Sequence, residues 1–256
     1  MSTDDSIRYA LDGPLARITI DRPPLNVLTI GMLDALSVCF ERAAADDNVR
    51  LILLRGEGKV FSAGVDVADH VGDRVEAMMD SLARLFITMD GLGKPTISVV
   101  DGPALGGGCE LILATDLCFA SERASFGQPE IRLGLFAPPA SVLLPRLIGM
   151  RRALWMLLSG ETISAPQAAA LSIVNEVFPQ ERLDAEVDER IARLSELSGV
   201  ALAHARRAAH LGVRGTVAQA HAAVNRVYLD ELMQTRDAAE GLAAFTEKRD
   251  PEWTHG

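Results

Sequence analysis

The sequence contains few cysteines, and their arrangement excludes two kinds of small stabilised scaffold. There are three, Cys39, Cys109 and Cys118, and no two of them show C-x-x-C spacing. An odd number without such spacing gives no basis for a disulfide framework or a zinc site. We therefore predict no metal centre, and we expect the cysteines to be small buried side chains in a reducing compartment.

Basic residues are also fewer than acidic ones. The 256 residues include 25 lysines and arginines against 35 aspartates and glutamates, which gives a formal net charge of −10. Proteins that bind nucleic acids rely on an excess of Lys and Arg to contact phosphates, so this balance argues against a nucleic-acid partner. A few local basic groups and helix N-termini can still bind a small anionic ligand, which the net charge does not exclude.

Long apolar runs are missing as well. No segment reaches the roughly 18 apolar residues that a membrane-spanning helix needs. The first ten residues, MSTDDSIRYA, are acidic and lack the basic and apolar regions of a secretion signal. These absences predict a soluble cytoplasmic protein with no membrane partner.

The pattern of apolar residues predicts an α/β fold with parallel, buried strands. Short strands and helices alternate, which favours parallel pairing over a β-sandwich. The expected strands are residues 16–20, 51–54, 96–100 and 116–120, and the expected helices are residues 30–45 and 75–90. With 48% hydrophobic residues, the chain can bury one large core, with or without an appendage.

After Gly149 the pattern becomes mostly helical. Helices are expected over residues 151–159, stopped by Gly160, over residues 164–171, capped by Ser164, and within residues 183–209. No strand is predicted after Val177.

Three consecutive glycines, Gly106–Gly108, stand where an apolar segment begins at Cys109. A helix is expected to begin there, and the glycines let a ligand approach uncovered backbone N–H groups. Glu110 falls on the first turn of this helix, and Glu130 follows Pro129 in a polar turn. Two carboxylates near bare backbone donors indicate acid–base chemistry on a carbonyl compound.

A second block, FSAGVD at residues 61–66, strengthens this interpretation, because a Gly-rich turn alone is more often plain loop geometry. The block follows a strand candidate and places Gly64 just before an expected helix start, with Asp66 positioned to cap that helix. Two such junctions can supply two N–H donors to one oxygen, which is the construction of an oxyanion hole.

Together with GPALGGGCEL and FGQPEIRLG, this block resembles, in order and separation, the enoyl-CoA hydratase/isomerase (crotonase) superfamily. The resemblance covers essentially the full chain, because DRPPLNVL is similar to the family's opening strand and turn and AFTEKRDPEW to its closing helix. It implies a crotonase-like right-handed spiral of β-β-α turns over residues 1–195. Residues 196–256 would form a helical region that builds a homotrimer or a dimer of trimers, and a helical cap on a monomer is the alternative.

The resemblance also implies roles for residues. The backbone N–H groups of Val65 and Gly107 would form the oxyanion hole, and Glu110 and Glu130 occupy the two positions of the carboxylate pair of hydratases. Glu130 would be the main proton donor to the α carbon and Glu110 would hold and activate water, with the division between them open. The alternative is a helix-start charge at Glu110 and a solvated loop residue at Glu130. No cofactor is expected, because coenzyme A is part of the substrate.

For coenzyme A, the resemblance implies a site along residues 65–68, with adenine near the Leu25–Asn26 turn. Many relatives carry a lysine shortly after the Asp of the first motif, but this chain has none there, so one phosphate contact is in doubt. The expected contacts are Leu25, Ala63, Asp66, Val67 and Ala68, with Phe245 and Lys248 as a hydrophobic wall and a charge. Phe245 and Lys248 could equally be ordinary helix residues.

A second departure concerns the acyl pocket. Pro138 and Pro139 stand where the family commonly has a Gly-rich turn, and they stiffen the backbone and add apolar volume. This feature is similar to hydratases that act on cyclic conjugated dienoyl-CoA thioesters of the cyclohexa-1,5-diene-1-carbonyl-CoA type. A straight-chain enoyl-CoA hydratase stays open as the alternative.

The leading hypothesis is a hydratase that adds water across the conjugated C=C bond of an enoyl-CoA thioester. Within the same fold, the alternative is a double-bond isomerase or another enolate-forming enzyme that uses one base. From a different class, the alternative is a non-catalytic binder of acyl-CoA or of RNA. The acidic balance weighs against RNA, and the intact glutamate pair weighs against an inactive enzyme.

Overall fold

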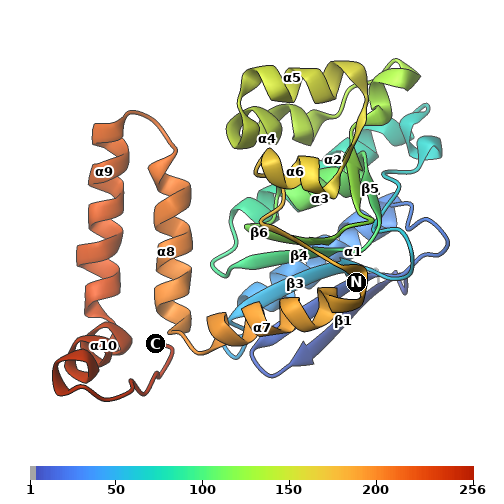
Figure 1. Ribbon diagram of the computed structural model, residues 1–256. Helices are drawn as coiled ribbons and strands as arrows, with labels where there is room; N and C mark the ends of the chain where they lie inside the picture. The colour runs from blue at the N-terminus through green and yellow to red at the C-terminus, as the bar shows by residue number, and fades with distance from the viewer. Residues whose placement is uncertain (1–3) are drawn as a thin grey trace. The chain divides into compact units, whose positions relative to one another are not determined.

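A six-stranded sheet forms the framework of the larger part of the chain (Figure 1). In the computed structural model, which describes residues 4–256, its strands follow the order β1-β2-β3-β4-β6-β9. β1 is antiparallel to β2, and the other neighbouring strands are parallel, as predicted. The strands are Ile7–Asp12, Leu15–Ile20, Leu51–Gly56, Thr96–Val100, Leu117–Ser121 and Glu176–Phe178.

A second, three-stranded sheet has the order β5-β7-β8, with β5 parallel to β7 and β7 antiparallel to β8. Its strands are Pro103–Leu105, Ser125–Gly127 and Thr162–Ser164. The sequence analysis does not predict this sheet, because three residues are too few to show a period of two. β5 leads directly into the glycine block, and β7 leads into the segment that carries Glu130.

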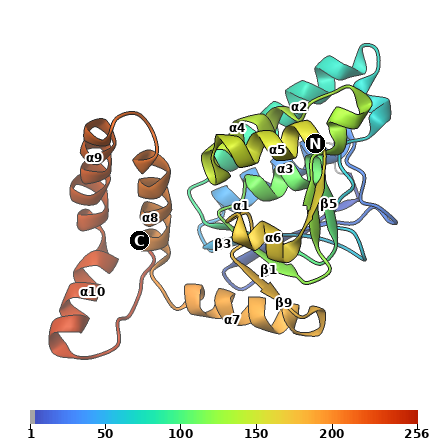
Figure 2. The ribbon, with the colours of Figure 1, turned by 45° about the horizontal axis from the view of Figure 1, so that its top comes forward.

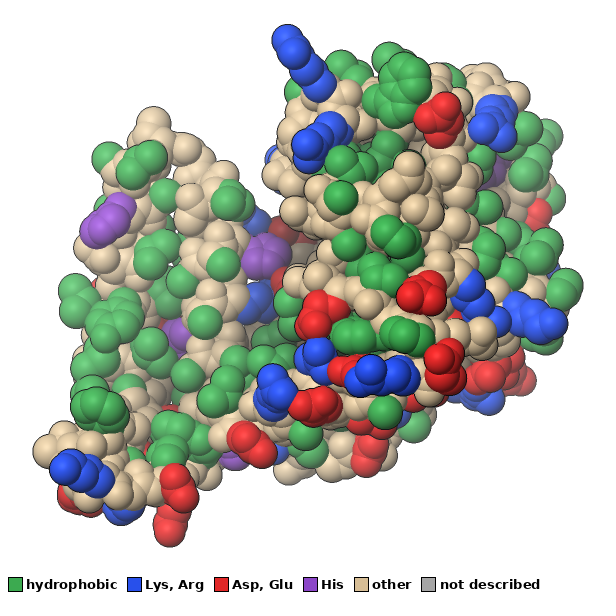
Figure 3. Space-filling model, in the orientation of Figure 1, with side chains coloured by type: hydrophobic (Ala, Val, Ile, Leu, Met, Phe, Trp, Pro, Cys, Tyr) green, Lys and Arg blue, Asp and Glu red, His purple; other side chains and the backbone are tan. Residues whose placement is uncertain are grey.

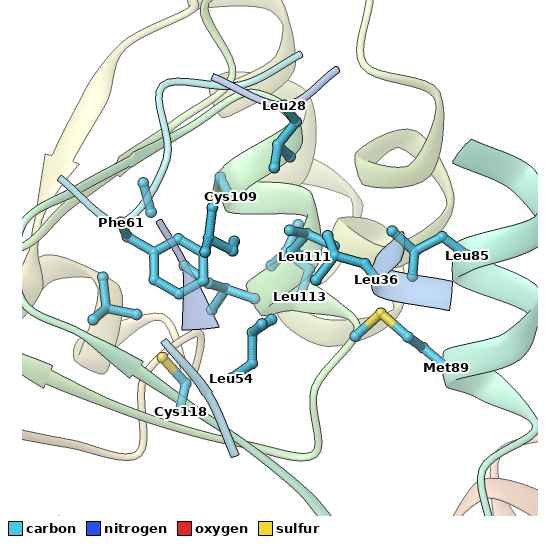
Figure 4. Close-up of a cluster of buried hydrophobic side chains, with 14 of the residues drawn as sticks. Leu28, Leu36, Leu54, Phe61, Leu85, Met89, Cys109, Leu111, Leu113 and Cys118 are labelled. Carbon is cyan, nitrogen blue, oxygen red and sulfur yellow. The ribbon is translucent and has the colours of Figure 1, made fainter. Parts of the chain in front are cut away.

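Three helices cover one face of the six-stranded sheet and enclose the main core. They are α1 (Ile30–Ala45), α2 (Arg74–Asp90) and α3 (Gly107–Leu113). The bounds of α1 agree with the prediction, and α2 and α3 each begin one or two residues early. Figure 4 shows Leu36 of α1, Leu85 and Met89 of α2, and Leu111 and Leu113 of α3 gathered with Leu54 of β3.

The opposite face of this sheet is covered by the first half of α7 (Leu183–Ser195). Leu53 and Val99 line one small hollow with Val187 of that helix, and the rings of Phe119 and Phe178 lie 6.4 Å apart. Because both faces are covered, the strand Leu51–Leu54 is apolar at every position. Acidic and basic side chains are intermingled on the surface in this region (Figure 3). Glu186 of α7 forms an ion pair with Arg182, the last residue of the 3₁₀ helix before it.

The remaining helices of this part are α4 (Pro138–Ile148), α5 (Met150–Ser159) and α6 (Ala165–Ala170), with the short 3₁₀ helices η1 (Val67–His70), η2 (Pro129–Leu133) and η3 (Gln180–Arg182). The predicted stop at Gly160 is confirmed, because this residue ends α5 with a φ of 62°. The predicted cap at Ser164 is also confirmed, since it forms a capping box with Gln167.

The predicted cap at Asp66 is confirmed, because its side chain accepts a 3.0 Å hydrogen bond from the Ala68 N–H at the start of the four-residue helix η1. The long helix α2 begins only at Arg74. Glu130, predicted in a polar turn, lies in the 3₁₀ helix η2.

The internal contacts divide the chain into two units. One comprises the chain up to Leu92 together with Thr96–Asp188, and the other comprises Gly93–Pro95 together with Glu189–Gly256. In the second unit, α8 (Gly199–Gly212) and α9 (Val217–Arg226) lie side by side (Figure 2) and are followed by the π-helical turn η4 (Val227–Glu231), η5 (Leu232–Gln234) and α10 (Arg236–Glu247). The role of residues 196–256 in oligomerisation stays a prediction.

No helix among the described residues combines the length and the apolar composition that crossing a bilayer requires.

A buried carboxylate, Asp237, organises the second unit. It accepts hydrogen bonds from the Ser198 hydroxyl at 2.5 Å, from the backbone and hydroxyl of Thr254 at 2.8 and 2.9 Å, and from the His255 N–H at 3.1 Å. Burial raises the pKa of Asp237, but these hydrogen bonds outweigh it and hold the pKa below its ordinary value. The carboxylate thereby ties the last residues of the chain to the starts of α8 and α10.

We expect Asp237→Asn to lower the free energy of unfolding by about 1–3 kcal/mol at pH 7, because an amide NH₂ would face donors where an oxygen now accepts. A depressed carboxyl pKa gives stability that is present above the ordinary value and is lost as the pH falls through the folded value. The difference between variant and wild type should therefore shrink below about pH 4. Urea unfolding at pH 7 and at pH 3.5 measures both effects, with the exposed Asp250→Asn as control. An equal difference at both pH values would contradict this account.

Candidate active site

Two loops from different parts of the sequence run side by side at the edge of the six-stranded sheet. Isolated parallel bridges join Ser62 to Ala104 and Leu28 to Val65. The Leu105 N–H donates to the Ser62 carbonyl at 2.9 Å, and the Gly106 N–H donates to the Gly127 carbonyl at 2.9 Å. The FSAGVD block, the glycine block and the start of the FGQPE segment are thus joined by backbone hydrogen bonds.

Each glycine of the block Gly106–Gly108 has its own steric reason. A methyl group on Gly106 would lie 2.5 Å from Glu130 Oε1, one on Gly107 would lie 2.7 Å from Val65 Cγ2, and one on Gly108 would lie 2.6 Å from the Ser62 carbonyl oxygen. Gly106 also has a φ of 51°, which disfavours any residue with a Cβ. The three glycines are therefore points of close approach rather than a flexible linker.

The Val65 N–H differs from the neighbouring backbone N–H groups in its hydrogen bonding. The Ala63 N–H donates to the Leu25 carbonyl, the Gly64 N–H to the Ser62 hydroxyl, and the Asp66 N–H to the Leu28 carbonyl. Within residues 4–256, the Val65 N–H donates to no protein acceptor. Since the bridge to Leu28 uses the Gly64 carbonyl and the Asp66 N–H, the Val65 N–H points to the other side of the strand.

The Gly107 amide lies next to the Val65 amide. A methyl group on Gly107 would lie 3.4 Å from Val65 N, and a methyl group on Gly64 would lie 3.4 Å from Gly107 N. As the first residue of α3, Gly107 has no intrahelical acceptor for its N–H. The loops therefore bring two unused backbone donors into one neighbourhood.

Glu110 is buried on the first turn of α3, and a helix that starts 28 residues later supplies its hydrogen bond. Its Oε1 accepts from the Ala140 N–H at 2.9 Å. Pro138 and Pro139 are the first two residues of α4 and have no N–H, so Ala140 is the first donor that this helix can offer. The prolines predicted to stiffen the backbone thus also decide which amide faces Glu110.

Glu130 presents its carboxyl group to the same region from η2. Its Oε1 is the atom that limits space at Gly106, and its Oε2 is buried without a hydrogen-bond partner among the described residues. The interpretation of Glu130 as a solvated loop residue is not supported, because the residue is half-buried and its Oε2 atom is buried from solvent. A buried polar atom without a partner indicates a place for a water molecule or a ligand atom.

Both carboxyl groups hold their protons more tightly than usual. Burial raises the pKa of Glu110 to about 8, the hydrogen bond from Ala140 opposes this rise, and the nearby charge of Glu130 adds to it. Burial also raises the pKa of Glu130, against its own backbone N–H and the charge of His70. Near neutral pH the pair can therefore carry one proton, which it can give to one atom and recover from another.

Comparison with known proteins adds to this geometry. Residues 12–256 match the model of the family described as enoyl-CoA hydratase/isomerase. The chain belongs to this family.

Individual members of the family cover nearly the whole chain. Cyclohexa-1,5-dienecarbonyl-CoA hydratase of Thauera aromatica is 38% identical over 244 residues, which is 94% of this chain and 93% of that protein. The crystal structure of enoyl-CoA hydratase from Bacillus anthracis superimposes with a TM-score of 0.93 at 28% identity and covers 98% of this chain and all of that chain. The structure of enoyl-CoA hydratase from Mycobacterium smegmatis gives 0.92 at 30% identity, with 97% and 98% covered. The predicted crotonase-like fold is thereby confirmed.

The residues predicted to contact coenzyme A in the first unit lie near the Val65 amide. Asn26 is buried and fixes the Leu25 turn, because its amide donates to the carbonyls of Glu57 and Val60 at 2.9 and 2.7 Å. Leu25 is half exposed, and its carbonyl accepts from the Ala63 N–H. Asp66 caps η1 at Ala68 and lies 3.8 Å from the guanidinium of Arg22.

Other predicted contacts lie farther along the chain. Val67 and Ala68 are exposed, and Pro138 is half-buried at the start of α4. Phe245 is exposed in α10, and Lys248 follows it with a φ of 58°. Phe245 and Lys248 belong to the second unit, so their contact with coenzyme A stays a prediction.

Two further polar side chains, which were not predicted, neighbour the predicted site residues in the sequence. Gln128 is buried, two residues before Glu130, and neither its Nε2 nor its Oε1 has a partner in the described part of the chain. His70 closes η1 and acts electrostatically on Glu130. No local sequence signal marks Gln128, because its burial follows from the three-residue strand Ser125–Gly127, which was not predicted.

The cysteines agree in part with expectation. Cys109 and Cys118 are buried, while Cys39 is only half-buried. Burial raises the pKa of the Cys118 thiol to about 12 and that of Cys109 as well, which keeps both thiols protonated and unreactive. Residues 4–256 contain no group of three or more His, Cys, Asp or Glu arranged to hold a metal ion.

We expect Gly106→Ala to displace the Glu130 carboxyl group, because the new methyl would lie 2.5 Å from Oε1. Gly13→Ala is the matched control, since Gly13 has a similar φ of 56° but no atom within 4 Å of its would-be Cβ. Both substitutions place a Cβ at a positive φ and should lower the free energy of unfolding, Gly106→Ala by more, because its ψ of −126° lies outside the left-handed helical region that residues with a Cβ can adopt. Crystal structures of the two variants provide the test, and an unmoved Glu130 in Gly106→Ala would refute the steric argument.

Proposed function

We propose that the protein adds water across the conjugated C=C bond of an enoyl-CoA thioester by the residues predicted from the sequence. The observation that carries this proposal is the meeting of two unused amides, of Val65 and Gly107, with two carboxyl groups of raised proton affinity, of Glu110 and Glu130. Membership of the enoyl-CoA hydratase/isomerase family and relatives named as hydratases support hydration over the isomerase alternative.

The two amides would bind the thioester oxygen. When water attacks the β carbon, negative charge collects on this oxygen as an enolate, and donors fixed at that point lower the barrier. Losing one such donor typically costs about 2.7–4 kcal/mol of activation free energy. Ser62 would keep the donors in place, because its hydroxyl accepts from the Gly64 N–H at 3.1 Å and its carbonyl accepts from the Leu105 N–H at 2.9 Å.

The carboxyl pair would manage the protons of the reaction. Hydration removes one proton from water and adds one to the α carbon, so a pair that carries one proton starts and ends in the same state. Glu130, whose Oε2 is free of protein partners in the described residues, would face the α carbon as main proton donor. Glu110, held by the Ala140 N–H through Oε1, would orient water with its second oxygen, and the division of acid and base roles between the two carboxyl groups stays open, because the raised pKa of Glu110 also lets it hold the proton of the pair.

The substrate class is the finer part of the proposal. The relative from Thauera aromatica is named for a cyclic dienoyl thioester, and α4 begins with the rigid pair Pro138–Pro139 beside Glu110. We therefore infer a cyclic conjugated dienoyl-CoA as the favoured substrate, with a straight-chain enoyl-CoA as the second candidate. The link to aromatic degradation follows from that choice and is part of this proposal.

The cytoplasmic location, the homotrimer or dimer of trimers and the absence of a cofactor are predictions. A non-catalytic acyl-CoA binder is disfavoured by the intact pair of Glu110 and Glu130, and RNA binding is disfavoured by the net charge of −10.

The proposal predicts loss of conjugated thioester absorbance when the protein is mixed with cyclohexa-1,5-diene-1-carbonyl-CoA or with short straight-chain enoyl-CoA thioesters. Glu110→Gln and Glu130→Gln should each lower kcat by about 10²–10⁴-fold, because each removes one partner in proton transfer. A one-base isomerase that uses Glu130 would instead keep most of its rate in Glu110→Gln. No hydration of any substrate in the panel would refute the assignment.

The raised pKa of Glu110 predicts how the activity depends on pH. The pair needs one proton, so kcat/KM should fall as the pH rises above about 8, where burial no longer keeps Glu110 protonated.

The raised pKa of Glu110 also makes the free energy of unfolding depend on pH. A raised carboxyl pKa gives stability that is complete below the ordinary value and is lost as the pH rises through the folded value. Urea unfolding from pH 5 to pH 9 should therefore show wild type losing stability relative to Glu110→Gln; parallel curves would contradict this.

A further inference from the structure

Asp69 is a buried carboxylate at the end of the segment that carries the Val65 amide. It lies in η1, and its side chain is almost completely removed from solvent. Its two oxygens bind two different helices. Oδ2 accepts from the Ile30 N–H at the start of α1 at 3.1 Å, and Oδ1 accepts from Arg74 Nε at 2.8 Å and from Arg74 Nη2 at the start of α2. The carboxylate thus joins three elements through charge-assisted hydrogen bonds.

Both partners of this carboxylate are donors that their own helices do not use. Ile30 is the first residue of α1, so its N–H has no intrahelical acceptor. Arg74 is the first residue of α2, where a basic side chain is disfavoured, because the free N–H groups give this end of a helix a positive potential. The pairing with Asp69, rather than the helix itself, therefore accounts for the position of Arg74.

Leu28 sets the direction of the Val65 N–H. The Leu28 N–H donates to the Gly64 carbonyl at 2.9 Å, and the Leu28 carbonyl accepts from the Asp66 N–H at 2.8 Å. The Gly64 carbonyl and the Val65 N–H belong to one trans peptide group, so they point in opposite directions. The bond to Leu28 thereby turns the Val65 N–H away from Leu28, and the direction of this donor depends on the register between residues 64–66 and Leu28.

Asp69 fixes the same register from its far end. Because η1 begins at Val67, the backbone leaves the ladder there, and the Asp69 side chain makes the next bond to the opposite segment, at Ile30. The Asp69 N–H also donates to the Asp66 carbonyl at 3.0 Å, which connects the carboxylate to the ladder through a single turn. Residues 64–69 are therefore tied to residues 28–30 on both sides of the Val65 amide.

We propose that Asp69 is a positioning residue of the active site, which holds the Val65 amide on the thioester oxygen by joining η1 to the start of α1. The inference rests on the proposed function, because it concerns one of the two oxyanion donors. These donors act on charge that develops in the transition state, so a displaced donor weakens transition-state binding more than substrate binding. Asp69 acts through the backbone of residues 64–66 rather than by contact with the substrate.

The kinetic test compares wild type with Asp69→Ala and Asp69→Asn. The Ile30 N–H is fixed in the backbone, whereas the Arg74 side chain is 61% exposed and can turn to water, so the one oxygen of Asn stays available for Ile30. We expect Asp69→Ala to lower kcat by about 10-fold or more, but by less than the roughly 10²–10³-fold that loss of a whole oxyanion donor costs, with little change in KM. Asp69→Asn should recover most of this loss. A raised KM at unchanged kcat, or an equal loss in both variants, would overturn the proposal.

A second test reads the oxyanion donors without turnover. Butyryl-CoA and cyclohexanecarbonyl-CoA have no conjugated C=C bond to hydrate, and the stretching frequency of their thioester carbonyl falls when N–H groups donate to its oxygen. Each probe, labelled with a heavy isotope at this carbonyl, is bound to the full-length protein and measured by infrared difference spectroscopy. We expect a lowered frequency in wild type, a frequency nearer to that of the free thioester in Asp69→Ala, and one close to wild type in Asp69→Asn.

Two further variants separate positioning from stability. Arg74→Gln removes the ion pair and leaves the bond from the Ile30 N–H, so it should lower the urea midpoint but keep the wild-type carbonyl frequency. Asp237→Asn is the matched control, because it removes the charge of another buried carboxylate, in the second unit, without touching residues 64–69. An unmoved frequency in Asp69→Ala, or a moved frequency in Arg74→Gln, would overturn the proposal.

The two tests separate the failure of this inference from the failure of the proposed function. A wild type that hydrates thioesters and lowers the carbonyl frequency, with Asp69→Ala doing the same, would keep its function and overturn the role of Asp69. A frequency that depends on Asp69 in a protein that hydrates none of the thioesters would support the positioning role and refute the hydratase assignment. A frequency equal to the free value in wild type would overturn both.

Discussion

The close contact between the Gly64–Val65 turn and the glycines Gly106–Gly108 leaves almost no space for side chains, and the arrangement of the site depends on it. A methyl group on any of the three glycines would lie 2.5–2.7 Å from a neighbouring atom, which is a side-chain atom of Glu130 or Val65 at Gly106 and Gly107 and the Ser62 carbonyl oxygen at Gly108. Only this approach lets amides from two separate loops share one neighbourhood. The same approach leaves room for the Glu130 carboxyl group beside Gly106. Steric contact therefore determines this arrangement. The absence of a Cβ at each of the three glycines lets the two amides and the Glu130 carboxyl group come close together.

Burial then gives the placed groups their chemistry. The sheet is covered on both faces, and Glu110 stands on a helix that faces the main core, so its carboxyl group is removed from water. Water would favour the ionised form, and its exclusion is the largest cause of the raised pKa. The hydrogen bond from Ala140 moderates this effect without abolishing it. Desolvation and one backbone donor, rather than a network of charged partners, set the acidity of Glu110.

The sequence predicts the parts of this protein that repeat a period or carry a strong motif. The helix Ile30–Ala45 and the strand Thr96–Val100 agree with their predicted bounds, because each has one clear apolar pattern and a clear break at its ends. The strand Ile7–Asp12 was not predicted, since most of its side chains are exposed and the apolar signal is weak. The three-residue strands of the second sheet were missed because they form through long-range pairing rather than local preference.

The site shows the same limit. Motif order identifies Val65, Gly107, Glu110 and Glu130 as a set, because the residue types and their separation are local facts of the sequence. It cannot identify Ala140 as the donor to Glu110 or His70 as a charge near Glu130, since these relations depend on how α4 and η1 fold back over the site. Gln128 lies between these cases: its burial follows from a short strand that the sequence does not reveal.

The two prolines at the start of α4 have a consequence for how the acidity of Glu110 could change in this chain. A proline contributes no amide hydrogen, so Pro138 and Pro139 leave the N-terminus of α4 with a single N–H that faces Glu110, that of Ala140. Replacing Pro139 alone would add a backbone N–H one position earlier in α4 without changing Glu110 or Glu130. The proton affinity of an active-site acid would then be tuned by the composition of a helix terminus nearly thirty residues away, which gives evolution a control that leaves the reacting groups themselves unaltered.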